Sequence, residues 1–454
     1  MTTALNMPID PLLGDWRQRL SPACVLEACR AQLQRVPADE RRRWQHAEMI
    51  EALYHPDRYV RVAYVLLDDP DTPPERRWPQ GQIVYLNAPV REPVSRRGQV
   101  IELDRQPAEA YTFPNDRRLR GLRKFTAKAA AVEAWQGWID ASTNDFVIDG
   151  ASLQRLLVRY VPEQKWIVRL RAEGIERASG ERTKRRIAIR SASPAATRRL
   201  AERHAQLSEV ADASNGLFRV PAVLGGRPAA GLLALEWIRG DSLVETLRRE
   251  PPEPVLRRVA AILAAVHRAR PAGLTPLTTR RLIERMQHAA GDLAAVSPPL
   301  AARLRRLARE FAALARSLPR VEPAALHNDF HWNQLRIKRD RCVLLDLERM
   351  CLGDPLIDVA TFVTQIRMLA VRPERLIDAT TAEHWTETFL TLWPQASQQP
   401  LDDARMRAYA ALSRLELARG MMRHLRPGWD MLAHRCVELA ETDLGALTPE
   451  VSTR

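Results

Sequence analysis

The chain has 454 residues, which predicts two or three domains, and its hydrophobic content of 46% is typical of a globular protein. No run of 18 apolar residues is present, and the N-terminus lacks a basic segment followed by an apolar one, so we expect no membrane partner, no secretory signal and a cytoplasmic location. The net charge is +14, but the arginines are spread along the chain without a nucleic-acid-binding motif, which argues against nucleic acid as the main partner. The five cysteines lack CxxC spacing and predict reduced, mostly buried thiols instead of a disulfide framework or a zinc site.

The first part of the chain mixes helical and strand patterns. Apolar residues recur at helical spacing across 11–53, and two β-like runs follow at Tyr59–Leu67 and Gln82–Leu86. A further helical pattern covers Thr126–Ile139. We expect residues 1–125 to form an N-terminal extension, whose role the sequence does not indicate.

Strand patterns dominate next, in the order β-β-β-α-β-β. The predicted elements are Leu153–Val161, Trp166–Ala172, Arg186–Arg190, the helix Ala195–Val210, Phe218–Leu224 and Leu232–Ile238. Helical patterns follow at Leu243–Arg249, Val255–Ala269, Thr279–Ala295 and Leu300–Leu318. We therefore expect a β-rich lobe over 126–238 and a helical lobe over 239–454, with a ligand cleft between them.

A polar island at 325–358 interrupts the helices. Asp329 follows one short apolar run and Asp346 ends another, and a hairpin between the runs would bring both carboxylates close to Gln334. Oxygen donors of this kind suit Mg²⁺ and, through the metal, phosphate groups. The pair His327 and His331 has the spacing of a zinc helix, but the residues between them are typical of a loop, which argues against zinc.

This island resembles the catalytic core of the aminoglycoside phosphotransferase and choline kinase-like family, with its H-x-D motif, a strand ending in Asp and a G-D-P-x-x-D motif. The resemblance implies an α+β, protein-kinase-like two-lobe fold and a reaction that uses ATP and Mg²⁺. It implies that Asp329 is the catalytic base, that Asp346 holds Mg²⁺ and that His327 supports the catalytic loop. Asp354 and Asp358 would be structural.

Two positions depart from the family pattern. Gln334 stands where the family usually has Asn, and we expect it to bind the metal, with Asn333 as the alternative. In the third strand of the β-rich lobe, Arg190 replaces the Lys that binds phosphate. Arg keeps the charge and offers a forked set of donors, so we expect Arg190 to contact the nucleotide.

The other residues expected to bind the nucleotide come from the β-rich lobe and its boundary. Lys184 and Lys165 are alternatives to Arg190, and the resemblance implies an ion-pair partner for it at Glu202, with Glu209 as the second choice. The resemblance also places the adenine at a hinge that comprises Glu236, Trp237 and Ile238. The turn Pro162–Lys165 stands where a phosphate-covering loop is expected, yet it contains no glycine.

The resemblance implies an enzyme that transfers the γ-phosphate of ATP to a hydroxyl of a small-molecule acceptor, such as a sugar, an amino alcohol or an aminoglycoside. Residues 401–454 carry eight acidic and eight basic side chains, so a neutral, polyol-like acceptor is favoured over a polycation. The alternative is an inactive kinase fold that binds nucleotide and regulates other proteins. His267 is expected to pack or hydrogen-bond, and Trp135, Trp138 and Trp385 are expected in the core or between lobes.

Overall fold

The computed structural model describes residues 7–8, 10, 13–73, 81–91, 94–119, 127–141, 146–339 and 341–445. Parts of the predictions at residues 11–12, Thr126 and Asp340 lie outside the described residues. The chain forms two compact units. The first comprises Met1–Ala201, Ala222–Trp237 and Arg423–Leu425, and the second comprises Glu202–Pro221, Ile238–Met422 and Arg426–Arg454.

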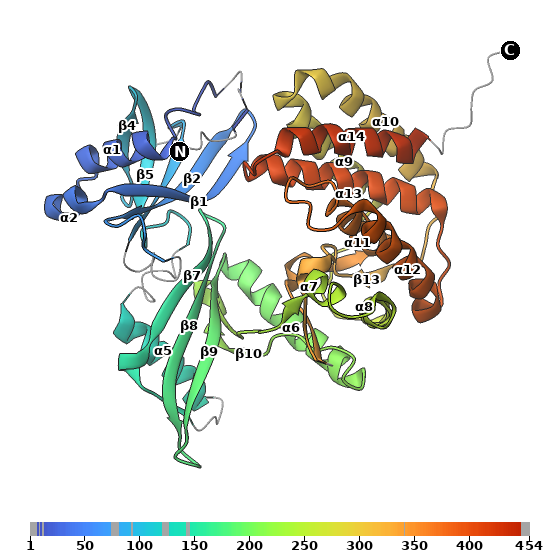
Figure 1. Ribbon diagram of the computed structural model, residues 1–454, viewed down its shortest axis with the longest axis horizontal. Helices are drawn as coiled ribbons and strands as arrows, with labels where there is room; N and C mark the ends of the chain where they lie inside the picture. The colour runs from blue at the N-terminus through green and yellow to red at the C-terminus, as the bar shows by residue number, and fades with distance from the viewer. Residues whose placement is uncertain are drawn as a thin grey trace. The chain divides into compact units, whose positions relative to one another are not determined.

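The first unit begins with two helices and a five-stranded antiparallel sheet of order β1-β2-β3-β5-β4 (Figure 1). Helix α1 contacts β1 and β4. The elements are α1 (Pro22–Gln32), α2 (Ala38–Arg43), β1 (His46–His55), β2 (Tyr59–Leu67), β3 (Gln82–Ala88), β4 (Gln99–Leu103) and β5 (Gln106–Thr112). The sheet confirms the predicted strands that begin at Tyr59 and Gln82. It also contains three strands that the sequence did not predict, namely β1, β4 and β5.

The prediction of helix at Trp44–Leu53 is wrong, because β1 pairs with β2 from His46↔Leu67 to His55↔Tyr59. The register of β1 shifts between Met49 and Glu51. Such a bulge breaks the alternation of inward and outward side chains, so the apolar residues of β1 lose the two-residue period of a strand. Pairing with the long, buried strand β2 therefore outweighs the local spacing of the apolar residues, and the segment forms a strand.

A second sheet, of order β10-β11-β9-β8-β6, follows in the same unit, and β7 pairs with β8 next to β6. Its elements, with the neighbouring helices, are α5 (Lys128–Ala141), β6 (Phe146–Ile148), η2 (Gly150–Ser152), β7 (Gln154–Val161), β8 (Lys165–Glu176), β9 (Arg182–Ser191), α6 (Pro194–Ala213), β10 (Val223–Arg227), η3 (Pro228–Ala230) and β11 (Leu232–Glu236). The predicted β-β-β-α-β-β order is confirmed. The strand predicted from Phe218 begins only at Val223, since Arg219 makes an isolated bridge with Val343 instead.

One hydrophobic core joins the two sheets of the first unit. Side chains of β2, β3 and β5 pack in the same buried cluster as those of α5 and of β7, β8, β9 and β11. Phe113 from the end of the first sheet lies 5.6 Å from Tyr160 and 6.1 Å from Trp166, centroid to centroid. Trp135 is buried in this cluster and Trp138 packs against it, so the predicted core position of both is confirmed. Strands β2, β3 and β5 of the first sheet therefore share one hydrophobic core with the second sheet.

The second unit is mainly helical and carries two small sheets, β12-β14-β15 and β13-β16. Helix α10 packs against both α9 and α14 (Figure 1). The elements are β12 (Asp241–Ser242), α7 (Leu243–Leu247), α8 (Pro252–Arg268), α9 (Thr279–Val296), η4 (Pro298–Leu300), α10 (Ala301–Ser317), β13 (Ala324–Leu326), η5 (Trp332–Gln334), β14 (Leu335–Lys338), β15 (Arg341–Leu344), η6 (Leu347–Arg349), β16 (Cys351–Gly353), α11 (Leu356–Met368), α12 (Ala379–Ser397), α13 (Asp403–Arg423) and α14 (Trp429–Gly445).

Three further observations bear on the sequence predictions. Strands β14 and β15 form the predicted hairpin, with Lys338 opposite Arg341. All five cysteines are free and four are buried, as expected. In the described part of the chain, no helix combines the length and the apolar character that a membrane crossing requires.

Candidate functional site

The loop between β13 and η5 carries His327 and Asp329 and is held by a buried carboxylate of α11. Asp358 is fully buried and accepts hydrogen bonds from the backbone N–H of His327 (2.8 Å) and of Asn328 (2.7 Å). The ring of His267 on α8 donates to the same carboxylate at 3.3 Å. These contacts confirm a structural role for Asp358 and the predicted hydrogen-bonding role of His267.

Asp354 is also structural, as predicted. Its carboxylate accepts from the backbone N–H of Leu356 at 3.0 Å, at the start of α11, and from the hydroxyl of Tyr409 at 3.0 Å. Arg405 lies 3.4 Å away. The residues that follow β16 are therefore tied to α13.

His327 links the loop of Asp329 to the segment between β15 and Asp346. Its Nε2–H donates to the carbonyl of Leu345 at 2.8 Å, and the histidine is fully buried. The N–H of Leu345 in turn donates to the carbonyl of Gln334 at 2.8 Å. The residues predicted as base and metal ligands thus lie on segments joined by direct hydrogen bonds.

Asp329 follows a residue in the left-handed conformation, Asn328 (φ 58°), whose side-chain oxygen accepts from Arg285 at 2.9 Å. The Asp329 side chain is 29% exposed and lies 3.5 Å from the guanidinium of Arg349. Burial raises the pKa of Asp329, the charge of Arg349 lowers it, and the charge of Asp346 raises it. The two carboxylates are therefore within electrostatic reach of each other.

Asp346 ends the segment after β15 in the left-handed conformation, with φ 55° and ψ 62°. Asp and Asn tolerate this conformation better than most residues. It turns the chain at the point where the sequence predicts a metal ligand.

Gln334 and Asn333 face different partners. The amide nitrogen of Gln334 lies 3.0 Å from Nε2 of His331, while the exposed Asn333 offers its side-chain oxygen to Arg336 at 3.0 Å. The N–H of Asn333 donates to Nδ1 of His331 at 3.2 Å. Burial lowers the pKa of His331 to about 3, so the ring is neutral at neutral pH. Because a neutral imidazole accepts at only one nitrogen, His331 accepts from one of these neighbours at a time.

The oxygen-rich donor set fits Mg²⁺. The carboxylate of Asp346 and the carboxamide of Gln334 come from paired segments, and the carboxylate of Asp329 is near. Oxygen ligands are the ones that Mg²⁺ prefers. Within the described ranges, no cluster of three or more His, Cys, Asp or Glu side chains is arranged to hold a metal. Two protein oxygens are nevertheless enough for Mg²⁺, which keeps water and phosphate as its other ligands.

Ion pairs that the sequence did not indicate join α9 and α13, and one of them, Arg285 with Glu416, lies near Asp329. Arg285 of α9 binds Glu416 of α13 through two hydrogen bonds of 2.7 and 2.5 Å. Burial by itself raises the pKa of Glu416, but the adjacent Arg285 outweighs this and leaves the pKa below its usual value. Arg419 pairs with Asp292 at 2.6 Å. Acidic groups of α9 and α13 are thus neutralised by arginines from the opposite helix, and no local motif could have revealed these pairs.

The residues predicted to bind the nucleotide come from several elements, and their roles stay predictions. Arg190 is buried on β9, opposite Leu233 of β11, whereas Glu202 and its alternative Glu209 are exposed on α6. Lys184 is engaged by Glu173 at 3.0 Å, and Lys165 begins β8 half-buried.

The predicted hinge follows β11. The N–H of Glu236 donates to the carbonyl of Ala222 at 2.9 Å. The Trp237 ring lies 5.4 Å from the guanidinium of Arg169, and Ile238 is half-buried. The N–H of Glu236 is thus engaged within the fold, and adenine binding at these residues stays a prediction.

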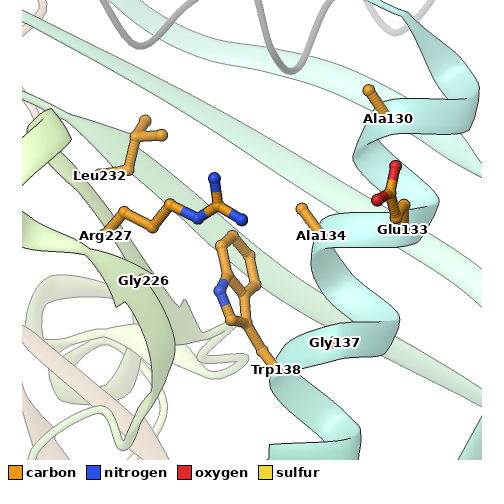
Figure 2. A pocket seen from close by; sticks show the side chains of 8 residues that line it. All are labelled: Ala130, Glu133, Ala134, Gly137, Trp138, Gly226, Arg227 and Leu232. Atoms are coloured by element: carbon orange, nitrogen blue, oxygen red, sulfur yellow. The ribbon is translucent and has the colours of Figure 1, made fainter.

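A separate hollow of about 600 Å³ lies in the first unit, between α5 and the β10–β11 hairpin. Figure 2 shows Trp138 and Arg227 on opposite elements of this hollow, with small residues such as Ala134 along the helix. Trp138 comes so close to the hairpin that a Cβ at Gly225 would lie 2.5 Å from its ring. None of the residues predicted for the catalytic site lines this hollow.

Comparison with known proteins places the catalytic segment in context. A family model described as "Phosphotransferase enzyme family" matches residues 146–417, which include every residue predicted for the site. Among similar solved structures is a thermostable mutant of aminoglycoside phosphotransferase APH(4)-Ia, with 18% identity, a TM-score of 0.47, and coverage of 66% of this chain and 97% of that one. Another is choline kinase from Cryptosporidium parvum, with 12% identity, a TM-score of 0.49, and coverage of 71% and 96%. No curated protein matched.

Proposed function

Because this chain belongs to the phosphotransferase enzyme family, we propose that it transfers the γ-phosphate of ATP to a hydroxyl of a small molecule, with Mg²⁺ as the metal. The observation that carries this proposal is the link between the segments of Asp329 and Asp346. His327 donates to Leu345 next to Asp346, and Leu345 donates to Gln334. A base and a metal ligand held this way meet the needs of phosphoryl transfer, which are positioning and charge stabilisation.

Asp329 would take the proton of the acceptor hydroxyl. Burial raises its pKa, which makes it a stronger base than an exposed carboxylate, while the charge of Arg349 opposes this rise. His327 and Asp358 would hold the loop so that this carboxylate keeps one position. Asp346 and Gln334 would bind Mg²⁺, which neutralises the charge of the phosphate groups.

The charges near Asp329 support a neutral, polyol-like acceptor over a polycation. A polycationic acceptor needs uncompensated carboxylates, yet Glu416 is paired with Arg285 and Asp292 with Arg419. Arg349, which is about half exposed, adds a positive charge beside the base. A hydroxyl-rich neutral molecule avoids repulsion from these arginines and offers many hydrogen-bonding groups.

The test is release of ADP from Mg-ATP in the presence of neutral sugars and polyols, amino alcohols and aminoglycosides. We expect acceptor-dependent ADP with a neutral polyol and its loss in Asp346→Asn, which keeps the shape of the left-handed turn. Asp378→Asn is the matched control, because Asp378 only caps α12. An aminoglycoside as the best acceptor would refute the neutral class. Nucleotide binding without turnover for any acceptor would favour the inactive regulatory fold.

A further inference from the structure

The turn between β7 and β8 is held in an unusual backbone conformation. It stands where the family resemblance implies a phosphate-covering loop, but Glu163, not glycine, takes the left-handed conformation with φ 61°. A non-glycine residue rarely adopts this conformation unless its surroundings enforce it. Something outside the turn must therefore hold it.

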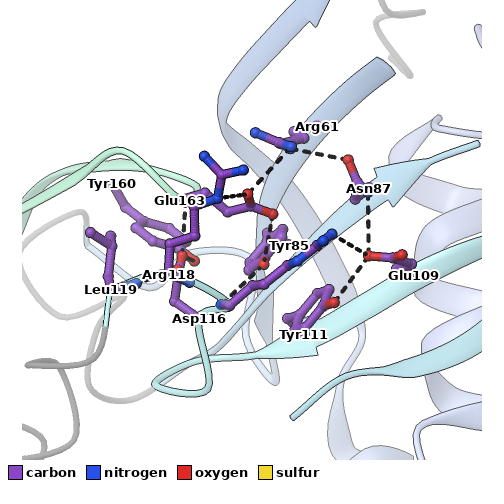
Figure 3. Close-up of polar contacts among 11 residues, drawn as sticks. Arg61, Tyr85, Asn87, Glu109, Tyr111, Asp116, Arg118, Leu119, Tyr160 and Glu163 are labelled. Carbon is purple, nitrogen blue, oxygen red and sulfur yellow. Dashed lines mark hydrogen bonds and ion pairs between the residues drawn. The ribbon is translucent and has the colours of Figure 1, made fainter. Parts of the chain in front are cut away.

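The side chain of Glu163 makes the first set of contacts that stabilise this conformation. It is only 1% exposed and forms ion pairs with Arg61 of β2 at 3.3 Å and with Arg118 after β5 at 3.1 Å (Figure 3). Tyr85 of β3 donates its hydroxyl to the same carboxylate at 3.5 Å. Burial raises the pKa of Glu163, and the two arginines oppose that effect. All three partners belong to the N-terminal extension.

Asp116, from the same extension, holds the backbone of the turn. Its carboxylate is fully buried and accepts from the N–H of Glu163 at 3.0 Å and from the hydroxyl of Tyr160 on β7 at 2.8 Å. Its other oxygen accepts from the N–H groups of Arg118 and Leu119, each at 2.8 Å. One carboxylate thus joins the extension to both the strand and the turn.

The network of hydrogen bonds around Glu163 continues into the first sheet. Arg61 donates to Asn87 at 3.0 Å, Asn87 donates to Glu109 at 3.3 Å, and the hydroxyl of Tyr111 donates to Glu109 at 3.0 Å (Figure 3). Tyr85 and Tyr111 stack at 4.7 Å within this network. The side chains that contact Glu163 are therefore themselves held by a hydrogen-bond network across β2, β3 and β5.

We propose that the sheet of β1–β5, together with the segment 113–119 that follows it, forms a fixed brace that sets the β7–β8 turn for the nucleotide phosphates, with Asp116 and Glu163 as the positioning residues. The proposal rests on the proposed function, since it needs a nucleotide at this turn. Replacing a buried ion pair by apolar side chains of the same size often leaves stability unchanged, so the role that we assign to these ion pairs is to fix the geometry of the turn. A turn that is already ordered spares the nucleotide the entropic cost of ordering a flexible loop.

The experiment measures the Kd for a non-hydrolysable ATP analogue in the full-length chain, so that turnover is not required. Glu163→Gln keeps the size of the side chain but removes its charge, and we expect the Kd to rise about tenfold. The kcat at saturating ATP and the KM for the acceptor should stay unchanged. Arg118→Gln, at a more exposed position, serves as a second, milder variant with a smaller rise in Kd.

Asp10→Asn is the matched control. Asp10 is also a buried carboxylate of the first unit, bonded to the N–H groups of Leu13 and Asp57 and to the hydroxyl of Tyr54, but it does not contact the turn. We expect this variant to lose stability and to keep the wild-type Kd. A purely structural role would instead make the Kd follow the loss of stability in both variants.

Three outcomes decide the matter. A rise in Kd confined to Glu163→Gln and Arg118→Gln supports the brace. An unchanged Kd in folded Glu163→Gln, or an equal rise in Asp10→Asn, overturns the brace and leaves the proposed kinase function intact. If the wild-type chain binds no ATP analogue, the proposed function and the brace are both overturned.

Discussion

The catalytic loop and the β7–β8 turn are held by the same device but at very different sequence distances. In the catalytic loop, the carboxylate of Asp358 accepts two backbone N–H groups from residues about thirty positions away. In the turn, the carboxylate of Asp116 accepts one N–H from Glu163, and Arg61 reaches the same residue from a hundred positions upstream. The comparison teaches that a local motif marks the first device, while only the fold reveals the second. We propose that the loop carries the reacting groups and that the turn contributes only its geometry.

The largest effect is expected at the reacting group of the loop. Asp329→Asn should lower kcat by roughly 10²- to 10⁴-fold, the range typical for a general base, because the amide cannot take the hydroxyl proton. Steady-state ADP release at saturating ATP measures this. Glu322→Gln is the control, since Glu322 is an exposed carboxylate of the same unit. A kcat within twofold of wild type would mean that the loop does not supply the base.

Removing each anchoring carboxylate compares the two devices directly. Asp358→Ala and Asp116→Ala should each lower the free energy of unfolding by about 3 kcal/mol, because each leaves buried N–H groups without an acceptor. Denaturant titration measures this loss. Only Asp358→Ala should also lower kcat at saturating ATP. Equal losses of kcat in the two variants would break the distinction between the loop and the turn.

The metal ligand can be tested with a matched pair of neighbours. Gln334→Leu should raise the Mg²⁺ concentration needed for half-maximal activity by about tenfold, because it removes an oxygen ligand. Asn333→Ala should leave that concentration unchanged, since the side-chain oxygen of Asn333 already accepts from Arg336. Titration of activity with Mg²⁺ measures both. The reverse result would assign the metal to Asn333.

The smallest effect is expected in the pH profile. The charge of Arg349 lowers the pKa of Asp329, which burial raises. Arg349→Gln should therefore move the acidic limb of kcat/KM to higher pH by roughly 0.5–1 unit, because the base stays protonated longer as the pH rises. Arg280→Gln, an exposed arginine of α9, should leave the limb in place. A shift to lower pH would show that Arg349 does not act on the base.

The sequence predicted the fold class and the catalytic loop because their signals are local. The α+β kinase-like fold and the family are confirmed by the match over 146–417. The hairpin that brings Gln334 near Asp346 also follows from a short segment, and the structure contains it. Roles in metal and nucleotide binding, including those of Gln334 and Arg190, stay predictions.

What the sequence could not predict depends on contacts between distant segments. Strand β1 resembles a helix because its bulge hides the alternation that its pairing with β2 would otherwise show. Arg285 and Glu416 lie 131 positions apart in the sequence and pair between two helices, so neither residue belongs to a local motif. The position of Glu163 in a turn would predict an exposed side chain, but in the structure this side chain is buried and paired with Arg61 of the first sheet.

The common core of the two sheets also limits how this protein can be shortened. A chain trimmed to the family-matched residues would leave Tyr160 and Trp166 without Phe113, which now packs near both rings. Large aromatic surfaces that lose their cover promote association between molecules. Anyone who transplants this catalytic module into a fusion protein should therefore carry the upstream sheet with it.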